Sequence, residues 1–270
     1  MIKIFIVTYN NPKLLNQNLK SLFDSYADFS DIKIEIINNY SVNFKLDDRF
    51  VDRVKVHHQT LRPDWSCGHL SRDWNQAIVN GFADLNNPWC EQLILAQDDL
   101  LWDKDWRQRL DKIHEDYTLY AADDGDCLIS LLPDAVKKIG LFDERFCAIG
   151  HHEGDYFIRA WLYNEEKSSI NDYRHRRVLN PTDIIVQRHR INGDQRSRVI
   201  DFNSTIHLPF WRLKWGDDVT PTTWSKWKIK DKNVIRPLIP NQFMYPYFEK
   251  DIEYTREKNY LHQGGKLIWG

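Results

Sequence analysis

The sequence predicts an α/β fold in which an open, mostly parallel sheet carries helices on both faces. Two observations predict it: short apolar runs alternate with helical patterns through the first two thirds of the chain, and polar residues follow these runs. The first run, residues 2–8, has few polar interruptions, as expected of a strand covered on both sides. A chain of 270 residues, 42% of them hydrophobic, is long enough to bury such a core.

The helices of this alternation are marked by apolar residues at helical spacing. Pro12 opens the first helix, and leucines recur on one face of the segment that follows it. A second helix is predicted over residues 70–85, where Trp74, Ile78 and Phe82 repeat every four residues. The remaining predictions are helices at residues 105–115, after Pro133 and at 155–164, and strands at 33–37, 54–57, 92–97, 127–132 and 182–187.

Composition and charge exclude several classes of protein. The 37 basic and 39 acidic residues leave a formal charge of -2, which argues against a nucleic-acid partner. No run approaches the roughly 18 apolar residues of a membrane-spanning helix, so we expect no transmembrane segment. Peripheral contact with a membrane is compatible with this expectation. The beginning of the chain lacks the pattern of a secretory signal, and the four cysteines form no CxxC pair. A cytoplasmic location is the simplest expectation.

The periodic pattern is lost near residue 200. The segment at residues 201–270 is rich in tryptophan and proline, and it contains no linker or internal repeat. We therefore expect it to be an extension that packs on the same domain as residues 1–200.

Polar residues after the strands are the candidates for binding. In open α/β sheets, ligands bind at the carboxyl ends of the strands, where the loops converge. This rule singles out Thr8, Tyr9 and Asn10 after the first strand, Asn38 and Asn39 after the second, Gln97, Asp98 and Asp99 after the fourth, and Arg188, His189 and Arg190 after the last.

The adjacent carboxylates of Asp98 and Asp99 are the sharpest local signal. They follow a buried hydrophobic strand, and hard oxygen ligands at a ligand-binding edge suit Mg²⁺ or Mn²⁺, which can bridge phosphate oxygens. The alternative is a solvated turn that only caps the next helix.

Two further segments carry charge. Glu153 and Asp155 begin a helix, where the macrodipole favours carboxylates, so simple capping is the alternative to a chemical role. The second segment is basic and brackets the last strand; its guanidinium groups could bind phosphates, and a solvated face or a nucleic-acid patch are the alternatives. Its members are Arg174, Arg176, Arg177, Arg188, Arg190, Arg196 and Arg198.

Taken in order, these motifs resemble family 2 glycosyltransferases of the GT-A fold. The resemblance covers about residues 1–216 and rests on the polar turns after the first and second strands, the carboxylate pair, the Gly-Leu-Phe-Asp-Glu-Arg-Phe segment at 140–146 and the Glu-x-Asp helix start. Lys214, Trp215 and Gly216 are similar to a motif of rhamnosyltransferase-like members. The resemblance implies a catalytic domain at residues 1–200 that binds a nucleotide sugar, with the extension on the acceptor side.

The resemblance also implies roles for individual residues. Glu153 takes the position of the catalytic base, with Asp155 as the alternative, and Asp99 and His189 would hold Mn²⁺ or Mg²⁺. The donor is implied to be a nucleotide-diphosphate sugar and the acceptor a glycan or another hydroxyl compound. The nucleotide would contact Thr8, Tyr9, Asn10, Asn38, Asn39, Arg72 and Asp98, and its diphosphate would contact Arg188, Arg190 and Arg196.

The sequence departs from the family pattern at Gln97, which replaces the first acid of the metal motif, and at Arg72, which is out of register. The expected reaction is a single displacement that inverts the anomeric configuration, with one carboxylate taking the proton of the acceptor hydroxyl. Two alternatives remain open. A nucleotidyltransferase would usually carry a glycine-rich loop after the first strand, whereas a catalytically inactive module would bind sugar or nucleotide without turnover.

Overall fold

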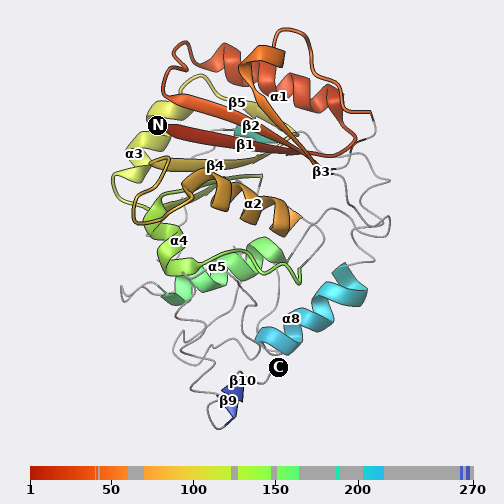
Figure 1. Ribbon diagram of the computed structural model, residues 1–270, viewed down its shortest axis with the longest axis vertical. Helices are drawn as coiled ribbons and strands as arrows, with labels where there is room; N and C mark the ends of the chain where they lie inside the picture. The colour runs from red at the N-terminus through yellow and green to blue at the C-terminus, as the bar shows by residue number, and fades with distance from the viewer. Residues whose placement is uncertain are drawn as a thin grey trace.

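A computed structural model of the chain describes residues 1–39, 41, 43–59, 70–122, 127–146, 151–163, 186–188, 203–215, 262–263 and 266–267. Its centre is a six-stranded sheet with the strand order β3-β2-β1-β4-β7-β6 (Figure 1). The strands are β1 (Ile2–Thr8), β2 (Ile32–Asn39), β3 (Lys55–Gln59), β4 (Gln92–Gln97), β6 (Leu119–Ala122) and β7 (Leu128–Leu131).

Most of this sheet is parallel. β1 pairs in parallel with β2 on one side and with β4 on the other, and β2 pairs in parallel with β3. β7 runs antiparallel to both β4 and β6. The carboxyl ends of β1, β2, β3 and β4 therefore lie along one edge of the sheet.

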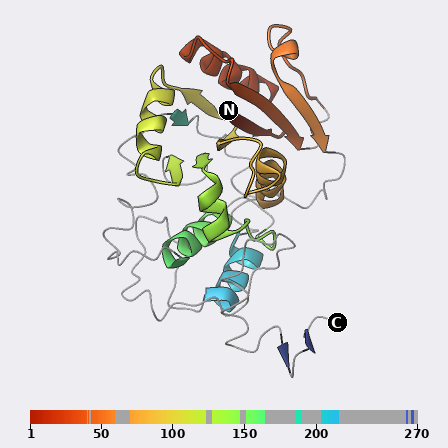
Figure 2. The same ribbon diagram turned by 60° about the vertical axis from the view of Figure 1, so that its left-hand side comes forward.

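Helices cover both faces of the sheet. Alternate residues of each strand point to opposite sides, so each face presents its own set of apolar side chains. The face that carries Phe5 and Leu95 packs on α2 (Leu70–Phe82), α4 (Pro133–Ile139), α5 (His152–Tyr163) and α8 (Leu208–Trp215). The face that carries Ile4 and Ile94 packs on α1 (Pro12–Ser25) and α3 (Trp106–His114). Figures 1 and 2 show α1 and α2 on opposite sides of the strands.

Helix α2 approaches the sheet closely. A Cβ atom on Gly81 would lie 2.6 Å from Leu93 Cδ1, so a larger residue here would force the buried Leu93 side chain of β4 to shift. Helix α2 therefore packs closely on the strand that precedes Asp98.

The sequence predictions differ from the structure in several places. The short strands β6 and β5 (Leu100–Trp102) were not predicted, and β7 is antiparallel. Helix α5 begins at His152 rather than at Asp155. The described part of the last predicted strand, β8 (Val186–Arg188), pairs with β5 outside the main sheet. Finally, α8 is regular helix in the segment for which no periodicity was recognised, and its Trp211 and Trp215 join the core of the main sheet.

Candidate active site

The ends of β1 and β4 are joined by a short hydrogen bond. The Thr8 hydroxyl donates to Asp98 Oδ2 over 2.6 Å, and the two strands are in parallel register up to Val7 and Gln97. The carboxylate pair therefore lies at the carboxyl edge of the sheet, directly beside the polar turn that follows β1. The sequence predicted that both segments lie at the carboxyl edge of the sheet, but it gave no strand order and did not predict this contact.

The acidic turn after β4 is held at both ends by one buried side chain of α1. Asn18 Nδ2 donates to the Gln97 carbonyl over 2.9 Å, and Asn18 Oδ1 accepts a hydrogen bond from Trp102 Nε1 over 2.9 Å. Asp98 and Asp99 lie between these two anchors. Sequence reasoning did not identify Asn18; an asparagine on the leucine-rich face of a helix was the available signal.

The carboxylate of Asp98 is costly to keep ionised. Burial raises the pKa of Asp98 to about 7, and the neighbouring charge of Asp99 acts in the same direction, whereas the Thr8 hydroxyl opposes them. Asp98 still keeps some contact with solvent, and Asp99 is buried. A divalent cation beside this pair would offset its negative charge.

The turns after β1 and β2 are tied together. The backbone N–H of Asn10, which has a φ of 51°, donates to the Ser41 hydroxyl over 2.6 Å. The backbone N–H of Ser41 donates to Asn38 Oδ1 over 3.0 Å, and Asn38 Nδ2 lies 2.9 Å from His58 Nδ1. A continuous set of polar contacts thus runs from the end of β1 to the end of β3.

A second set of contacts joins this edge to α2. Asn39 is buried, and its Nδ2 donates to Asp73 Oδ2 over 2.8 Å. Arg72, the preceding residue of α2, is half-buried. Tyr9 is 37% exposed. The edge therefore brings together Thr8, Tyr9, Asn10, Asn38, Asn39 and Asp98. The sequence analysis did not identify Asp73, because nothing in the sequence shows that this acid of α2 points into the protein.

The short ladder of β5 and β8 approaches the acidic turn. Leu100, which follows Asp99, is the register partner of Arg188. The backbone at Arg188 is therefore beside the turn, and the predicted diphosphate role of its side chain stays a prediction. The other basic or metal-binding candidates of this segment, His189, Arg190 and Arg196, lie outside the described residues.

Glu153 lies in the first turn of α5. It is half-buried, and its Oε2 is 3.1 Å from Nδ1 of the buried His152. The preceding residue, His151, has a φ of 67°, so the chain turns sharply into the helix. The helix N-terminus favours an ionised carboxylate at this point.

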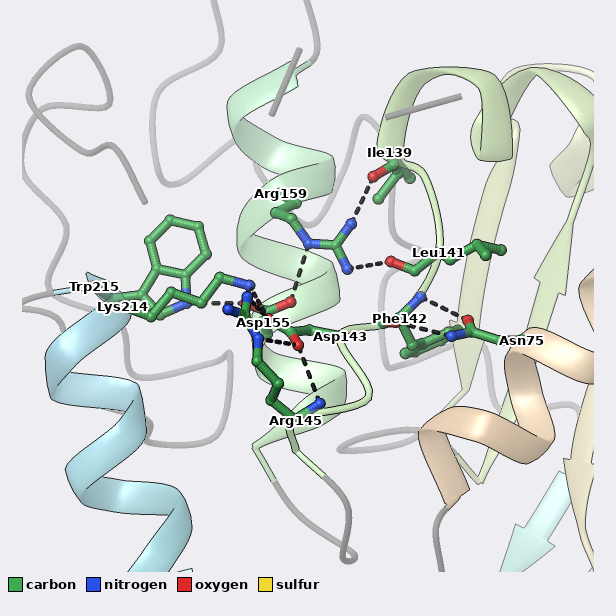
Figure 3. A network of polar contacts seen from close by, with 10 residues as sticks. All are labelled: Asn75, Ile139, Leu141, Phe142, Asp143, Arg145, Asp155, Arg159, Lys214 and Trp215. Carbon is green, nitrogen blue, oxygen red and sulfur yellow. Dashed lines mark hydrogen bonds and ion pairs between the residues drawn. The ribbon is translucent and has the colours of Figure 1, made fainter. Parts of the chain in front are cut away.

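Asp155 has a different environment from Glu153, because it is fully buried in a network of charges (Figure 3). Its carboxylate contacts Arg159 Nε at 3.0 Å, Lys214 Nζ at 2.5 Å and Trp215 Nε1 at 3.1 Å. Arg159 also donates to two backbone carbonyls before α5, those of Ile139 and Leu141, over 2.6 Å each. These contacts fix the first turns of α5 rather than present Asp155 to a substrate.

Lys214 links two carboxylates within this network. It lies 2.7 Å from Asp143 Oδ2, and Arg145 contacts the same carboxylate over 2.6 Å and 2.8 Å. Although burial opposes ionisation, the charges of Lys214 and Arg145 hold the pKa of Asp143 below its ordinary value. Burial lowers the pKa of Lys214, and Asp143 and Asp155 act against that shift. The sequence had marked Lys214 and Trp215 only as a motif, without a role.

Asn75 of α2 completes the framework around α5. Its side chain binds both the N–H and the carbonyl of Phe142, over 2.8 Å and 2.9 Å, and also contacts Glu144. Figure 3 shows α2, α5 and α8 converging on the segment at residues 139–145. Three helices are therefore connected through the chain that precedes Glu153.

Within the described ranges, no group of three or more His, Cys, Asp or Glu side chains could hold a metal ion. Asp98 and Asp99 provide hard oxygen ligands side by side at this edge, so they fit Mn²⁺ or Mg²⁺, with further ligands to come from elsewhere. No helix within the described ranges is both long enough and apolar enough to span a membrane.

We compared the sequence and the fold with those of known proteins. No family model matches the chain, and no curated protein matches it. Among solved structures, it is similar to the mannosyltransferase PcManGT from Pyrobaculum calidifontis in complex with GDP-Man and Mn²⁺, with a TM-score of 0.50 and 12% identity. That alignment covers 76% of this chain and 64% of the other. The chain has the GT-A fold.

A second similar structure is S. aureus TarS in complex with UDP-GlcNAc, with a TM-score of 0.48 and 12% identity over 73% of this chain. The alignment covers 60% of the TarS chain. This chain therefore spans less than two thirds of both proteins. At such low identity, the similarity to the mannosyltransferase establishes the fold alone.

Proposed function

We propose that this chain transfers a sugar from a nucleotide-diphosphate sugar to a hydroxyl group of a glycan or other acceptor, with inversion at the anomeric carbon. The hydrogen bond between Thr8 and Asp98 carries the proposal, because it places a carboxylate pair beside the polar turn of β1 at the carboxyl edge of a GT-A sheet. The similar P. calidifontis mannosyltransferase was solved with a nucleotide sugar and Mn²⁺, which supports this choice of substrate and cation.

The donor would lie along this edge. We expect the nucleoside to contact Thr8, Tyr9, Asn10, Asn38, Asn39, Arg72 and Asp98. The hydrogen bonds between the turns after β1 and β2, and from Asn39 to α2, support this placement. Asp99 and His189 would hold Mn²⁺ or Mg²⁺, and Arg188, Arg190 and Arg196 would bind the diphosphate. A bound cation would supply positive charge to the departing diphosphate, and the arginines would add to it.

Glu153 is the proposed base. It keeps contact with solvent, and the helix N-terminus favours its ionised form, so it can accept the proton of an acceptor hydroxyl as that oxygen bonds to the anomeric carbon. The bond from the anomeric carbon to the diphosphate breaks in the same displacement, and its electron pair leaves with the diphosphate. Asp155 is proposed as a positioning residue, since Arg159, Lys214 and Trp215 already occupy its carboxylate.

The proposal is tested by incubating the protein with UDP-, GDP- and dTDP-sugars, Mn²⁺ and a panel of acceptors, and measuring diphosphate release. We expect release from at least one donor and its loss in Glu153→Gln, with nucleotide-sugar binding retained. The matched control is Glu115→Gln, an exposed glutamate at the end of α3, which should turn over like the wild type. Tight binding without any release would indicate a non-catalytic module instead.

A further inference from the structure

The end of β3 carries an exposed histidine whose protonation pattern is determined by its neighbours. His58 Nδ1 lies 2.9 Å from Asn38 Nδ2. The orientation of the Asn38 amide is fixed by Ser41, because a backbone N–H can only donate and it donates to Asn38 Oδ1 over 3.0 Å. Asn38 Nδ2 is therefore the donor to His58, and Nδ1 of the neutral imidazole is the acceptor.

The position of the proton on His58 follows from this chain of hydrogen bonds. A neutral imidazole has one donor and one acceptor nitrogen, so an accepting Nδ1 places the proton on Nε2. The ring is also held in orientation, because it packs edge-on against Phe44 with ring centroids 5.1 Å apart and an interplanar angle of 87°. His58 is exposed to solvent, so it offers a preorganised N–H donor at the surface.

This donor lies at the correct end of the sheet to meet a nucleobase. His58 is the register partner of Asn38, Asn38 is the partner of Thr8, and Thr8 binds Asp98. Three strand spacings separate β3 from β4, or about 14 Å in total. That span is comparable with an extended nucleoside diphosphate whose phosphates lie at the acidic turn and whose base lies at β2 and β3.

We propose that His58 is a specificity-determining residue that selects donors whose base carries an oxo group at position 4 of a pyrimidine or position 6 of a purine. This inference rests on the proposed function and names its substrate class. Uracil, thymine and guanine present an acceptor at that position, whereas cytosine and adenine present an amino donor. A fixed N–H donor can hydrogen bond to the oxo group of uracil, thymine or guanine. With cytosine or adenine it would face another donor, and the unmade hydrogen bond would lower the affinity.

Two measurements on the full chain test the inference. Long-range proton–nitrogen NMR spectra of the free protein at pH 8 report which nitrogen of His58 carries the proton, and we expect Nε2. Calorimetric titration with UDP, GDP, CDP and ADP in the presence of Mn²⁺ should show UDP and GDP binding about tenfold or more tightly than CDP and ADP. In His58→Ala the difference should disappear, and in Lys55→Ala, an exposed neighbour on β3, it should persist.

Each outcome decides the matter. A proton on Nδ1, or a base preference unchanged in His58→Ala, overturns the inference. Equal binding of all four nucleotides by the wild type also overturns it but leaves the proposed function standing. If no nucleotide binds, the proposed function fails and the inference fails with it. His58→Ala also removes a hydrogen-bond partner of the buried Asn38, so its thermal unfolding is measured beside that of the wild type; a single cooperative transition well above the assay temperature separates lost recognition from lost structure.

Discussion

The ammonium of Lys214 lies 2.5 Å from the carboxylate of Asp155, and both side chains are fully buried. Lys214 belongs to α8 and Asp155 to the first turns of α5, so this ion pair connects a helix near the C-terminal part of the described chain to the helix that carries Glu153. The proposed base is therefore positioned by a segment that follows it by about sixty residues in the sequence.

Lys214→Met should strongly destabilise the protein. The substitution leaves Asp143 and Asp155 buried with one cation fewer, and breaking a buried pair of this kind typically costs about 3–5 kcal/mol. The free energy of unfolding in urea measures the effect. Arg212→Met, an exposed position on the same helix, is the control and should change stability by less than about 0.5 kcal/mol. Equal effects of the two substitutions would contradict the structural role of Lys214.

Asp98→Asn should stabilise the metal-free protein in a manner that depends on pH. The pKa of Asp98 is about 7 in the folded chain and about 3.9 when unfolded, so the folded state binds the proton more tightly. The contribution of Asp98 to stability therefore falls as pH rises from about 4 to 7. The gain from Asp98→Asn should be larger at pH 8 than at pH 4.5, as measured by urea unfolding in the presence of a chelator. The same gain in stability at both pH values would show that burial of the ionised Asp98 carboxylate does not destabilise the folded chain.

Asn18→Ala should disturb the acidic turn and not only the stability of α1. The Gln97 carbonyl and the Trp102 indole lose their buried partner, at an expected cost of about 1–3 kcal/mol. Mn²⁺ affinity should also fall, because the turn between these anchors carries Asp98 and Asp99. Gln17→Ala, the exposed neighbour on α1, should leave both quantities unchanged. Normal Mn²⁺ affinity in Asn18→Ala would show that the turn does not depend on this anchor.

Asp99→Asn should weaken Mn²⁺ binding without loss of the fold. A carboxylate is a far better ligand for a hard cation than a neutral amide, and Asp99 is the proposed ligand. Electron paramagnetic resonance of free Mn²⁺ measures the affinity directly and requires no turnover. Asp103→Asn, which alters a partly exposed acid just beyond β5, provides the comparison. If the two variants bind Mn²⁺ equally well, Asp99 is not a ligand.

The sequence predicted those parts of the fold that depend on local periodicity. β1, α1, β4 and α4 lie where apolar spacing and proline placed them. The four-residue strand Leu119–Ala122 is too short to show alternation, and the antiparallel direction of β7 depends on its partners rather than on its own residues. Helix α5 begins at His152, three residues before the boundary predicted at residue 155, and its first turn includes Glu153, which the charge pattern had placed at a helix start.

The site was predictable to the extent that it lies at strand ends. Thr8 and Asp98 were both expected at the carboxyl edge of the sheet, and the structure adds that their side chains are hydrogen bonded. The supporting residues Asn18 and Lys214 could not be predicted, because their partners come from distant segments that only tertiary packing brings together. The chemical roles of Asp99 and Glu153 stay predictions that rest on the proposed function.

The anomeric configuration of the product tests the central claim most directly. Proton NMR of a reaction with the donor that releases diphosphate should show a new glycosidic bond of inverted configuration, because a single displacement at the anomeric carbon exchanges its faces. A retained configuration would contradict the account, and so would bound donor that stays intact with every acceptor supplied.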